Sequence, residues 1–182
     1  MPSPSHTKDG RANKHGKPVL YLSSERETAV KEARAWVDSL VTVSRIAMNR
    51  VVRLVNCLDT KLEAANRFSL SLKRKFDGQN VGGCNKKARI SPRELEQLVW
   101  HEIGEAFAMP LRIEDDLRCY LPTQVLAEVI QSTGADGLIH FSSLGDGENV
   151  VLFDPNLARV IASHVTRIRK LVVVLDDDGP FY

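Results

Sequence analysis

YLPTQVLAEVIQSTGADGLIHFSSLGDGENVVLF, the stretch from residue 120 to residue 153, predicts one helix followed by two strands. Apolar residues recur at helical spacing over 122–132, and Gly134 suits the cap that ends such a helix. The apolar runs 138–141 and 149–153 each predict a short strand. The inward face of the helix is predicted to comprise Val125, Leu126, Val129 and Ile130. A helix that leads directly into two strands indicates a fold that combines both kinds of element.

Three further helices are predicted outside this stretch. Ser24 and Glu27 have the spacing of a capping box, which predicts a helix directly after them. Ser91-Pro92 predicts the start of a second helix and Asp154-Pro155 the start of a third, because Pro is favoured at the first helical position. The buried faces are predicted to be Ala29, Ala33, Trp36 and Val37 in the helix after Ser24, and Leu157, Val160, Ile161 and Val165 in the helix after Pro155.

Short apolar or β-branched runs predict the remaining strands at 18–22, 41–47, 51–55 and 171–175. The predicted strands and helices are mixed along the chain without regular βαβ alternation. That order favours an α+β fold over a doubly wound sheet. We therefore expect an α+β fold, formed as a single compact domain with a mixed sheet.

The length of 182 residues suits one domain. Residues 1–17 are polar and predict a flexible lead-in, and the domain itself is expected over 10–175. A stretch at about 66–90 interrupts the pattern with lysines, arginines and glycines, and we interpret it as a basic loop or insertion.

Composition excludes several classes of function. Lys plus Arg number 25 and Asp plus Glu number 23, a balance that argues against a dedicated nucleic-acid binder. No run approaches the roughly 18 apolar residues of a membrane span, and the N-terminus has no apolar signal segment, so we expect a cytoplasmic protein. Cys57, Cys84 and Cys119 are far apart and form no CxxC pair, which predicts free thiols. We expect no metal site.

Five residues are candidates for a functional site: Arg11, Tyr21, Glu32, Ser142 and Asn149. Taken singly, most have an ordinary structural explanation. Arg11 lies in a polar segment where arginines are usually solvated, and Glu32 lies at the edge of an apolar helix face. Tyr21 ends an apolar run, and Ser142 follows a predicted strand where Ser often forms a turn. Their value as candidates comes from the order in which they occur together.

Together with their neighbours, these residues resemble the RES domain, a family named for its Arg, Glu and Ser. The first half of the resemblance is Gly10-Arg11-Ala12-Asn13, Val19-Leu20-Tyr21-Leu22, Thr28-Ala29 and Glu32-Ala33-Arg34. The second half is Tyr120-Leu121-Pro122-Thr123-Gln124, Ala127-Glu128, Gly134-Ala135-Asp136-Gly137, Ser142-Ser143, Asn149 and Leu152-Phe153. The resemblance implies a fold similar to ADP-ribosyltransferases and an activity that destroys NAD. It also implies the toxin of a bacterial type II toxin–antitoxin system, whose antitoxin partner has a helix-turn-helix region.

If NAD is the substrate, each candidate has a role that suits its chemistry. Glu32 is expected to stabilise the positive charge that develops on the ribose, or to hold the attacking water. Arg11 suits the pyrophosphate because a guanidinium donates two parallel hydrogen bonds to phosphate oxygens. Tyr21 is expected to stack on nicotinamide or to pack against the ribose. Ser142 and Asn149 are expected to bind the ligand or to orient Glu32.

Catalysis is thus assigned to Glu32, Arg11 and Ser142, and NAD binding to Arg11, Tyr21, Ser142 and Asn149. Ser142 is not expected to be a nucleophile, because no base stands next to it in the sequence. For His140, two residues earlier, a structural role is the simpler interpretation. No cofactor is expected beyond NAD as the substrate.

Three alternatives stay open. The same site serves a protein ADP-ribosyltransferase, because only the acceptor differs between water, phosphate and a side chain. A second alternative is a catalytically inactive binding or interaction module. A third uses the basic groups between Lys73 and Arg89 to bind nucleic acid, although a solvated loop explains them better. A homo-oligomer is also compatible with the sequence.

Overall fold

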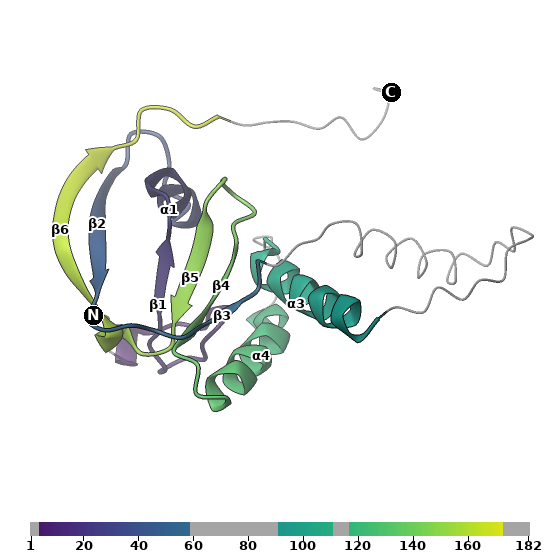
Figure 1. The fold of residues 1–182 in the computed structure, drawn as a ribbon. Coiled ribbons are helices and arrows are strands. Elements are labelled where there is room, and N and C mark those ends of the chain that lie inside the picture. The colour runs from purple at the N-terminus through teal and green to yellow at the C-terminus, as the bar shows by residue number, and fades with distance from the viewer. Residues whose placement is uncertain (1–3, 59–90, 111–116, 173–182) are drawn as a thin grey trace, which may run out of the picture.

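The computed structural model describes residues 4–58, 91–110 and 117–172 (Figure 1). The helices are α1 (Arg26–Glu32), α3 (Pro92–Ala108) and α4 (Leu121–Ser132). The strands are β1 (Leu20–Ser23), β2 (Leu40–Met48), β3 (Leu54–Asn56), β4 (Gly137–Phe141), β5 (Glu148–Leu152) and β6 (Ala158–Arg167). Short 3-10 segments cover Pro4–His6, Leu117–Tyr120 and Pro155–Leu157.

Four strands form one mixed sheet in the order β1-β5-β4-β3. β5 is antiparallel to both of its neighbours, whereas β3 runs parallel to β4. β2 and β6 form a separate antiparallel ribbon, with a register shift between Arg45 and Ile46. The predicted α+β fold with a mixed sheet is therefore confirmed.

The four-stranded sheet is covered on both faces. Successive side chains of a strand point to opposite faces, so Val151 and Leu152 of β5 enter two different clusters. Val151 belongs to a cluster with Ala12, Phe107, Ala127, Ile130, Leu138 and Phe153. Leu152 joins Leu157 and Ala158, against which Ile46 of β2 packs. Figure 1 shows the resulting layers, with the sheet between the β2–β6 ribbon and helices α3 and α4.

Helix α4 exists as predicted and is followed by Gly134 at a positive φ of 81°, but its inward face differs from the prediction. Its buried residues are Thr123, Gln124, Ala127 and Ile130. Val129, predicted to be inward, is 56% exposed, and Val125 is also exposed. The helix is rotated because Gln124 finds buried hydrogen-bond partners, so a polar side chain takes a position that apolarity alone would assign to a valine.

The prediction of a helix after Asp154-Pro155 is wrong. Only Pro155–Leu157 forms a 3-10 turn, which Asp154 caps by accepting a hydrogen bond from the backbone N–H of Asn156 at 2.9 Å. The chain then continues as β6, which pairs with β2 from Ala158 to Arg167. The apolar spacing that suggested a helix falls on β-branched residues, and pairing with a long neighbouring strand decides the structure of such a segment.

Helix α1 starts later and ends earlier than predicted. The predicted capping box is absent, since Glu25 is the N-cap and makes no side-chain cap hydrogen bond. The Ser24 hydroxyl instead accepts a hydrogen bond from the backbone N–H of Glu148 at 2.9 Å. The helix ends at Glu32, so Trp36 lies beyond it and is 72% exposed. The buried side chain of α1 is that of Thr28.

The strand predicted at 51–55 is present as the shorter β3. Leu171 and Val172 are not in a strand, and the rest of the strand predicted at 171–175 lies outside the described residues. The basic stretch at 66–90 also lies outside them. Among the described residues, no helix has both the length and the apolar character needed to cross a membrane.

Helix α3 reaches the end of β3 at Gly104. A Cβ on Gly104 would lie 2.4 Å from the backbone oxygen of Cys57. The Cys57 backbone is itself held, because its N–H donates to the carbonyl of Ile139 at 2.9 Å. Neither the α3 backbone nor the Cys57 backbone can move away easily. This close approach therefore depends on the absence of a side chain at position 104.

We predict that Gly104→Ala destabilises the protein by roughly 1–3 kcal/mol, through steric overlap with Cys57. The sign is diagnostic, because Gly→Ala at an unhindered helix position is stabilising. Urea unfolding of the parent and the variant measures the change, with Glu105→Ala at an exposed neighbouring position as the control. A more stable Gly104→Ala protein would contradict the packing described here.

Asp136 ties the turn after α4 to the segment that leads into β3. Its carboxylate accepts hydrogen bonds from Arg50 Nη1 at 2.9 Å and Nη2 at 2.6 Å, and from the backbone N–H of Arg53 at 2.8 Å. These hydrogen bonds lower the pKa of Asp136 from its ordinary value of 3.8 to about 2. The hydrogen bond from the Arg50 side chain makes the largest contribution to this shift. The Arg53 side chain also donates to the carbonyl of Gly134.

The stability contributed by Asp136 is expected to depend on pH in one direction. Because its folded pKa is depressed, the contribution is complete above the unfolded pKa near 4 and is lost as the pH falls toward about 2. Asp136→Asn is therefore expected to be less stable than the parent at pH 7, with the difference shrinking below about pH 4. Unfolding at several pH values tests this, with Asp146→Asn as a control. A difference independent of pH would contradict it.

Candidate active site

Glu32, the last residue of α1, is held by two side chains that are distant in the sequence. Its Oε1 accepts a hydrogen bond from the Ser142 hydroxyl at 2.7 Å and another from Asn149 Nδ2 at 2.6 Å. Ser142 follows β4, and Asn149 lies in β5. The structure thus brings together three of the five residues that the sequence proposed as a site.

The loop between β4 and β5 determines where Ser142 and Asn149 lie. Asn149 pairs with His140 across the two strands, and the backbone N–H of Ser142 donates to the carbonyl of Gly147 at 3.2 Å. The Ser142 hydroxyl also accepts a hydrogen bond from the N–H of Leu144 at 3.1 Å. Ser142 is therefore oriented by its own loop as well as by Glu32.

Thr28 docks α1 against this loop. Its hydroxyl accepts a hydrogen bond from the N–H of Gly147 at 3.3 Å. Side chains at Gly145 and Gly147 are excluded, because a Cβ at either position would lie 2.5 or 2.9 Å from the Thr28 hydroxyl oxygen. Residues four apart lie on one face of a helix, so docking through Thr28 directs Glu32 toward the same loop. Thr28 is not among the five predicted site residues, although it lies in the Thr28-Ala29 motif.

Arg11 lies partly buried, with its Nη1 donating to the carbonyl of Phe107 at 2.5 Å. Burial lowers the pKa of its guanidinium, and electrostatic interactions with Tyr120 and Glu32 act in the opposite direction. Arg34, two residues after Glu32, also lies within electrostatic reach and adds positive charge. Arg11 and Glu32 therefore belong to one electrostatic environment.

A buried hydrogen-bond network holds the backbone around Arg11. Gln124 Nε2 donates to the carbonyls of Gly10 at 3.0 Å and Asn13 at 2.9 Å, and to Asp9 Oδ1 at 3.3 Å. Asn13 Nδ2 in turn donates to the carbonyl of Lys8 at 2.8 Å. The sequence placed Arg11 in a polar lead-in, whereas the structure buries its neighbours Ala12 and Asn13. Gln124 belongs to the family motif but is not one of the five predicted site residues.

Tyr21 combines a held hydroxyl with an exposed ring. The hydroxyl donates to Asn13 Oδ1 at 2.9 Å and accepts from the N–H of Ala12 at 3.0 Å. Burial of this end of the side chain raises the pKa of Tyr21 to about 12. The residue as a whole is 48% exposed. An aromatic face that is anchored at its polar end and open to solvent is suited to stacking against a flat ligand.

His140 is buried between β4 and α3. Its Nδ1 lies 2.7 Å from the carbonyl oxygen of Phe141, and its ring centroid lies 5.8 Å from that of Phe107. Burial is the largest effect on its pKa, which is lowered. This packing agrees with the structural role expected for His140.

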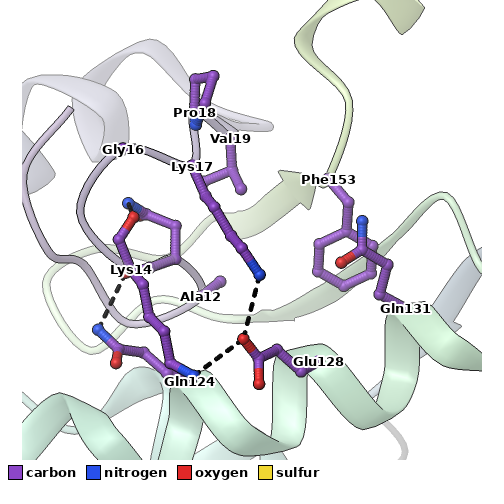
Figure 2. Close-up of a pocket in the computed structure, with 11 residues that line it drawn as sticks. Ala12, Lys14, Gly16, Lys17, Pro18, Val19, Gln124, Glu128, Gln131 and Phe153 are labelled. Carbon is purple, nitrogen blue, oxygen red and sulfur yellow. Dashed lines mark hydrogen bonds and ion pairs between the residues drawn. The ribbon is translucent and has the colours of Figure 1, made fainter. Parts of the chain in front are cut away.

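A separate cavity of about 320 Å³ lies between residues 12–19 and α4 (Figure 2). Figure 2 shows the side chains of Lys14 and Lys17 reaching Glu128, whose Oε1 lies 3.0 and 3.3 Å from their Nζ atoms. Ala12 and Asn13 contribute to its wall, whereas Glu32 and its partners do not. This cavity therefore lies beside the segment that carries Arg11 and is distinct from the Glu32 cluster.

In the part of the chain that the structure describes, no group of three or more His, Cys, Asp or Glu side chains could hold a metal ion. The free cysteines described there are Cys57, which is buried, and Cys119, which is exposed.

Comparison with known proteins supports the family resemblance seen in the sequence. A family model described as the RES domain matches residues 1–173. The matched range contains all five candidate residues. No curated protein and no solved structure matches the chain.

We predict that Gln124→Met destabilises the protein by roughly 1–3 kcal/mol, because buried carbonyls of the Arg11 segment lose their donor. The amides of Gly10 and Asn13 are expected to exchange faster with deuterium, since these two residues also bond to each other. Chemical unfolding and hydrogen exchange measure the two effects, and Gln131→Met, at an exposed position of the same helix, is the control. Equal stability and exchange in parent and variant would contradict this role for Gln124.

Proposed function

Because the chain belongs to the RES domain family, we propose that it is an enzyme that cleaves the N-glycosidic bond of NAD and releases nicotinamide. The observation that carries this proposal is the carboxylate of Glu32, whose Oε1 is held by Ser142 and Asn149. Among the described residues, no hydrogen bond reaches its Oε2. A carboxylate held through one oxygen presents the other to a ligand.

The chemistry of the reaction explains why a positioned carboxylate is useful. Nicotinamide leaves as a neutral molecule from a cationic donor, and the ribose acquires oxocarbenium character. A carboxylate near the ribose stabilises this positive charge in the transition state, or accepts a hydrogen bond from the attacking water. Glu32 is solvent-exposed, so a substrate can reach it. Ser142 and Asn149 hold the carboxylate in place before the substrate binds.

Arg11 supplies the anion-binding group in this proposal. One guanidinium nitrogen is occupied by the Phe107 carbonyl, and a guanidinium has five N–H donors in all. The remaining donors suit the oxygens of a pyrophosphate. Arg34 reinforces the positive potential at Arg11, and neighbouring cations favour a bound dianion.

Tyr21 is the proposed surface for the nicotinamide or the adjoining ribose. Its ring is exposed while its hydroxyl is held by Asn13 and Ala12. Side-chain entropy lost on ligand binding is therefore small, because the ring is already ordered.

We also propose, from the family, that the chain is the toxin of a bacterial type II toxin–antitoxin system. In that setting it lowers the cellular NAD concentration, and an antitoxin with a helix-turn-helix region covers its site. NAD is the substrate in this proposal, and no further cofactor takes part.

We predict that the parent chain releases nicotinamide from NAD and that Glu32→Gln lowers kcat by about 100-fold or more, because the charge that stabilises the ribose cation is lost. Chromatography of free nicotinamide measures the rate. Glu27→Gln, at an exposed position of the same helix, is the matched control, and circular dichroism shows whether each variant is folded. Release at the parent rate by folded Glu32→Gln would exclude Glu32 from catalysis.

The second product identifies the acceptor. Free ADP-ribose indicates water, phosphorylated ADP-ribose indicates phosphate, and labelled protein indicates ADP-ribosyl transfer. NAD binding without nicotinamide release would instead favour the inactive binding module.

A further inference from the structure

Ser23 makes a hydrogen bond to Asn149, one of the two residues that hold the Glu32 carboxylate. Ser23 is the last residue of β1 and stands directly opposite Asn149 of β5. Its hydroxyl donates to Asn149 Oδ1 at 2.6 Å, and Asn149 Nδ2 donates to Glu32 Oε1 at 2.6 Å. A hydroxyl, an amide and a carboxylate therefore form a continuous chain that starts on the neighbouring strand.

These hydrogen bonds require one orientation of the Asn149 side-chain amide. An ionised carboxylate accepts hydrogen bonds and donates none, so the Asn149 amide must present its NH₂ group to Glu32. With the amide reversed, its oxygen would face a carboxylate oxygen. The hydroxyl of Ser23 favours the correct orientation, because it supplies a donor at the position that the amide oxygen must then occupy. Asn149 is buried, so water replaces such a donor at a cost.

We propose that Ser23 is a positioning residue of the NAD-cleaving site, which orients the Asn149 amide so that the amide holds Glu32. This inference rests on the proposed function. Ser142 holds the same oxygen of Glu32 independently. Loss of Ser23 therefore loosens the carboxylate and does not release it.

Kinetics of three variants test the proposal. Ser23→Ala is expected to lower kcat about tenfold, the rate equivalent of one net hydrogen bond, with little change in the KM for NAD. Ser23→Thr retains the hydroxyl on a strand that tolerates β-branching, and it is expected to restore kcat. Ser24→Ala is the matched control, because it removes a neighbouring hydroxyl that accepts a hydrogen bond from the Glu148 backbone and is not among the described donors to Glu32 or Asn149. A kcat for Ser23→Ala within about twofold of the parent would overturn the proposal. So would an equal loss in Ser24→Ala, or no recovery in Ser23→Thr.

A second measurement examines the orientation without using turnover. The side-chain amide signal of Asn149 in a ¹H–¹⁵N spectrum is assigned as the one missing from Asn149→Asp. Its protons are expected to exchange slowly with solvent in the parent and in Ser23→Thr, and faster in Ser23→Ala. Unchanged exchange in Ser23→Ala would overturn the orienting role. If the parent releases no nicotinamide, the proposed function fails, and amide exchange still decides whether Ser23 orients Asn149.

Discussion

The pairing of β5 with both β1 and β4 is the constraint on which the rest of the structure depends. β5 lies in the interior of the mixed sheet, and Val151 and Leu152 are fully buried on its two opposite faces. These two residues connect the layers on either side. The same strand carries Asn149 at its N-terminal end. The register that buries the core therefore also places the polar Asn149 amide near the N-terminal end of β5, within hydrogen-bond distance of Glu32 at the end of α1.

The candidate site is built by neutral groups around charged ones. Hydroxyl and amide donors hold Glu32, and a backbone carbonyl holds Arg11. Glu32 and Arg11 influence each other electrostatically without a direct ion pair between them among the described contacts. An arrangement of this kind leaves both charges able to bind complementary parts of a ligand. A dinucleotide with a cationic ring and an anionic pyrophosphate has such parts.

Two sets of buried hydrogen bonds support this site, and each joins a loop to a helix. Thr28 attaches α1 to Gly147 in the loop between β4 and β5, and Gln124 attaches the Arg11 segment to α4. Tyr21 contacts the second set through its hydroxyl. The exposed groups thus rest on buried polar contacts, whose geometry is restrictive because an unpaired buried polar group is costly. This explains how a segment without regular structure can hold Arg11 in place.

Much of the fold followed from local patterns, but the buried faces of the helices did not. Helical spacing and caps predicted α3 and α4, and apolar runs predicted β1, β2, β4 and β5, because these signals act over a few neighbouring residues. The segment after Pro155 has both helical spacing and β-branched residues, and only the partner strand β2 resolved that ambiguity in favour of β6. Likewise, the rotation of α4 depends on hydrogen-bond partners of Gln124 that are more than 110 residues away in the sequence.

For the site, the sequence by itself determined the chemical types and the family, because Arg11, Tyr21, Glu32, Ser142 and Asn149 occur in a recognisable order. Their assembly was decided by the tertiary structure. Hydrogen bonds across 110 and 117 residues join Ser142 and Asn149 to Glu32, and no local spacing encodes such contacts. Ser23, Thr28 and Gln124 acquire their importance only from what they touch. The physical reason is that residue identity supplies donors, acceptors and charges, whereas strand register and helix docking decide which of them meet.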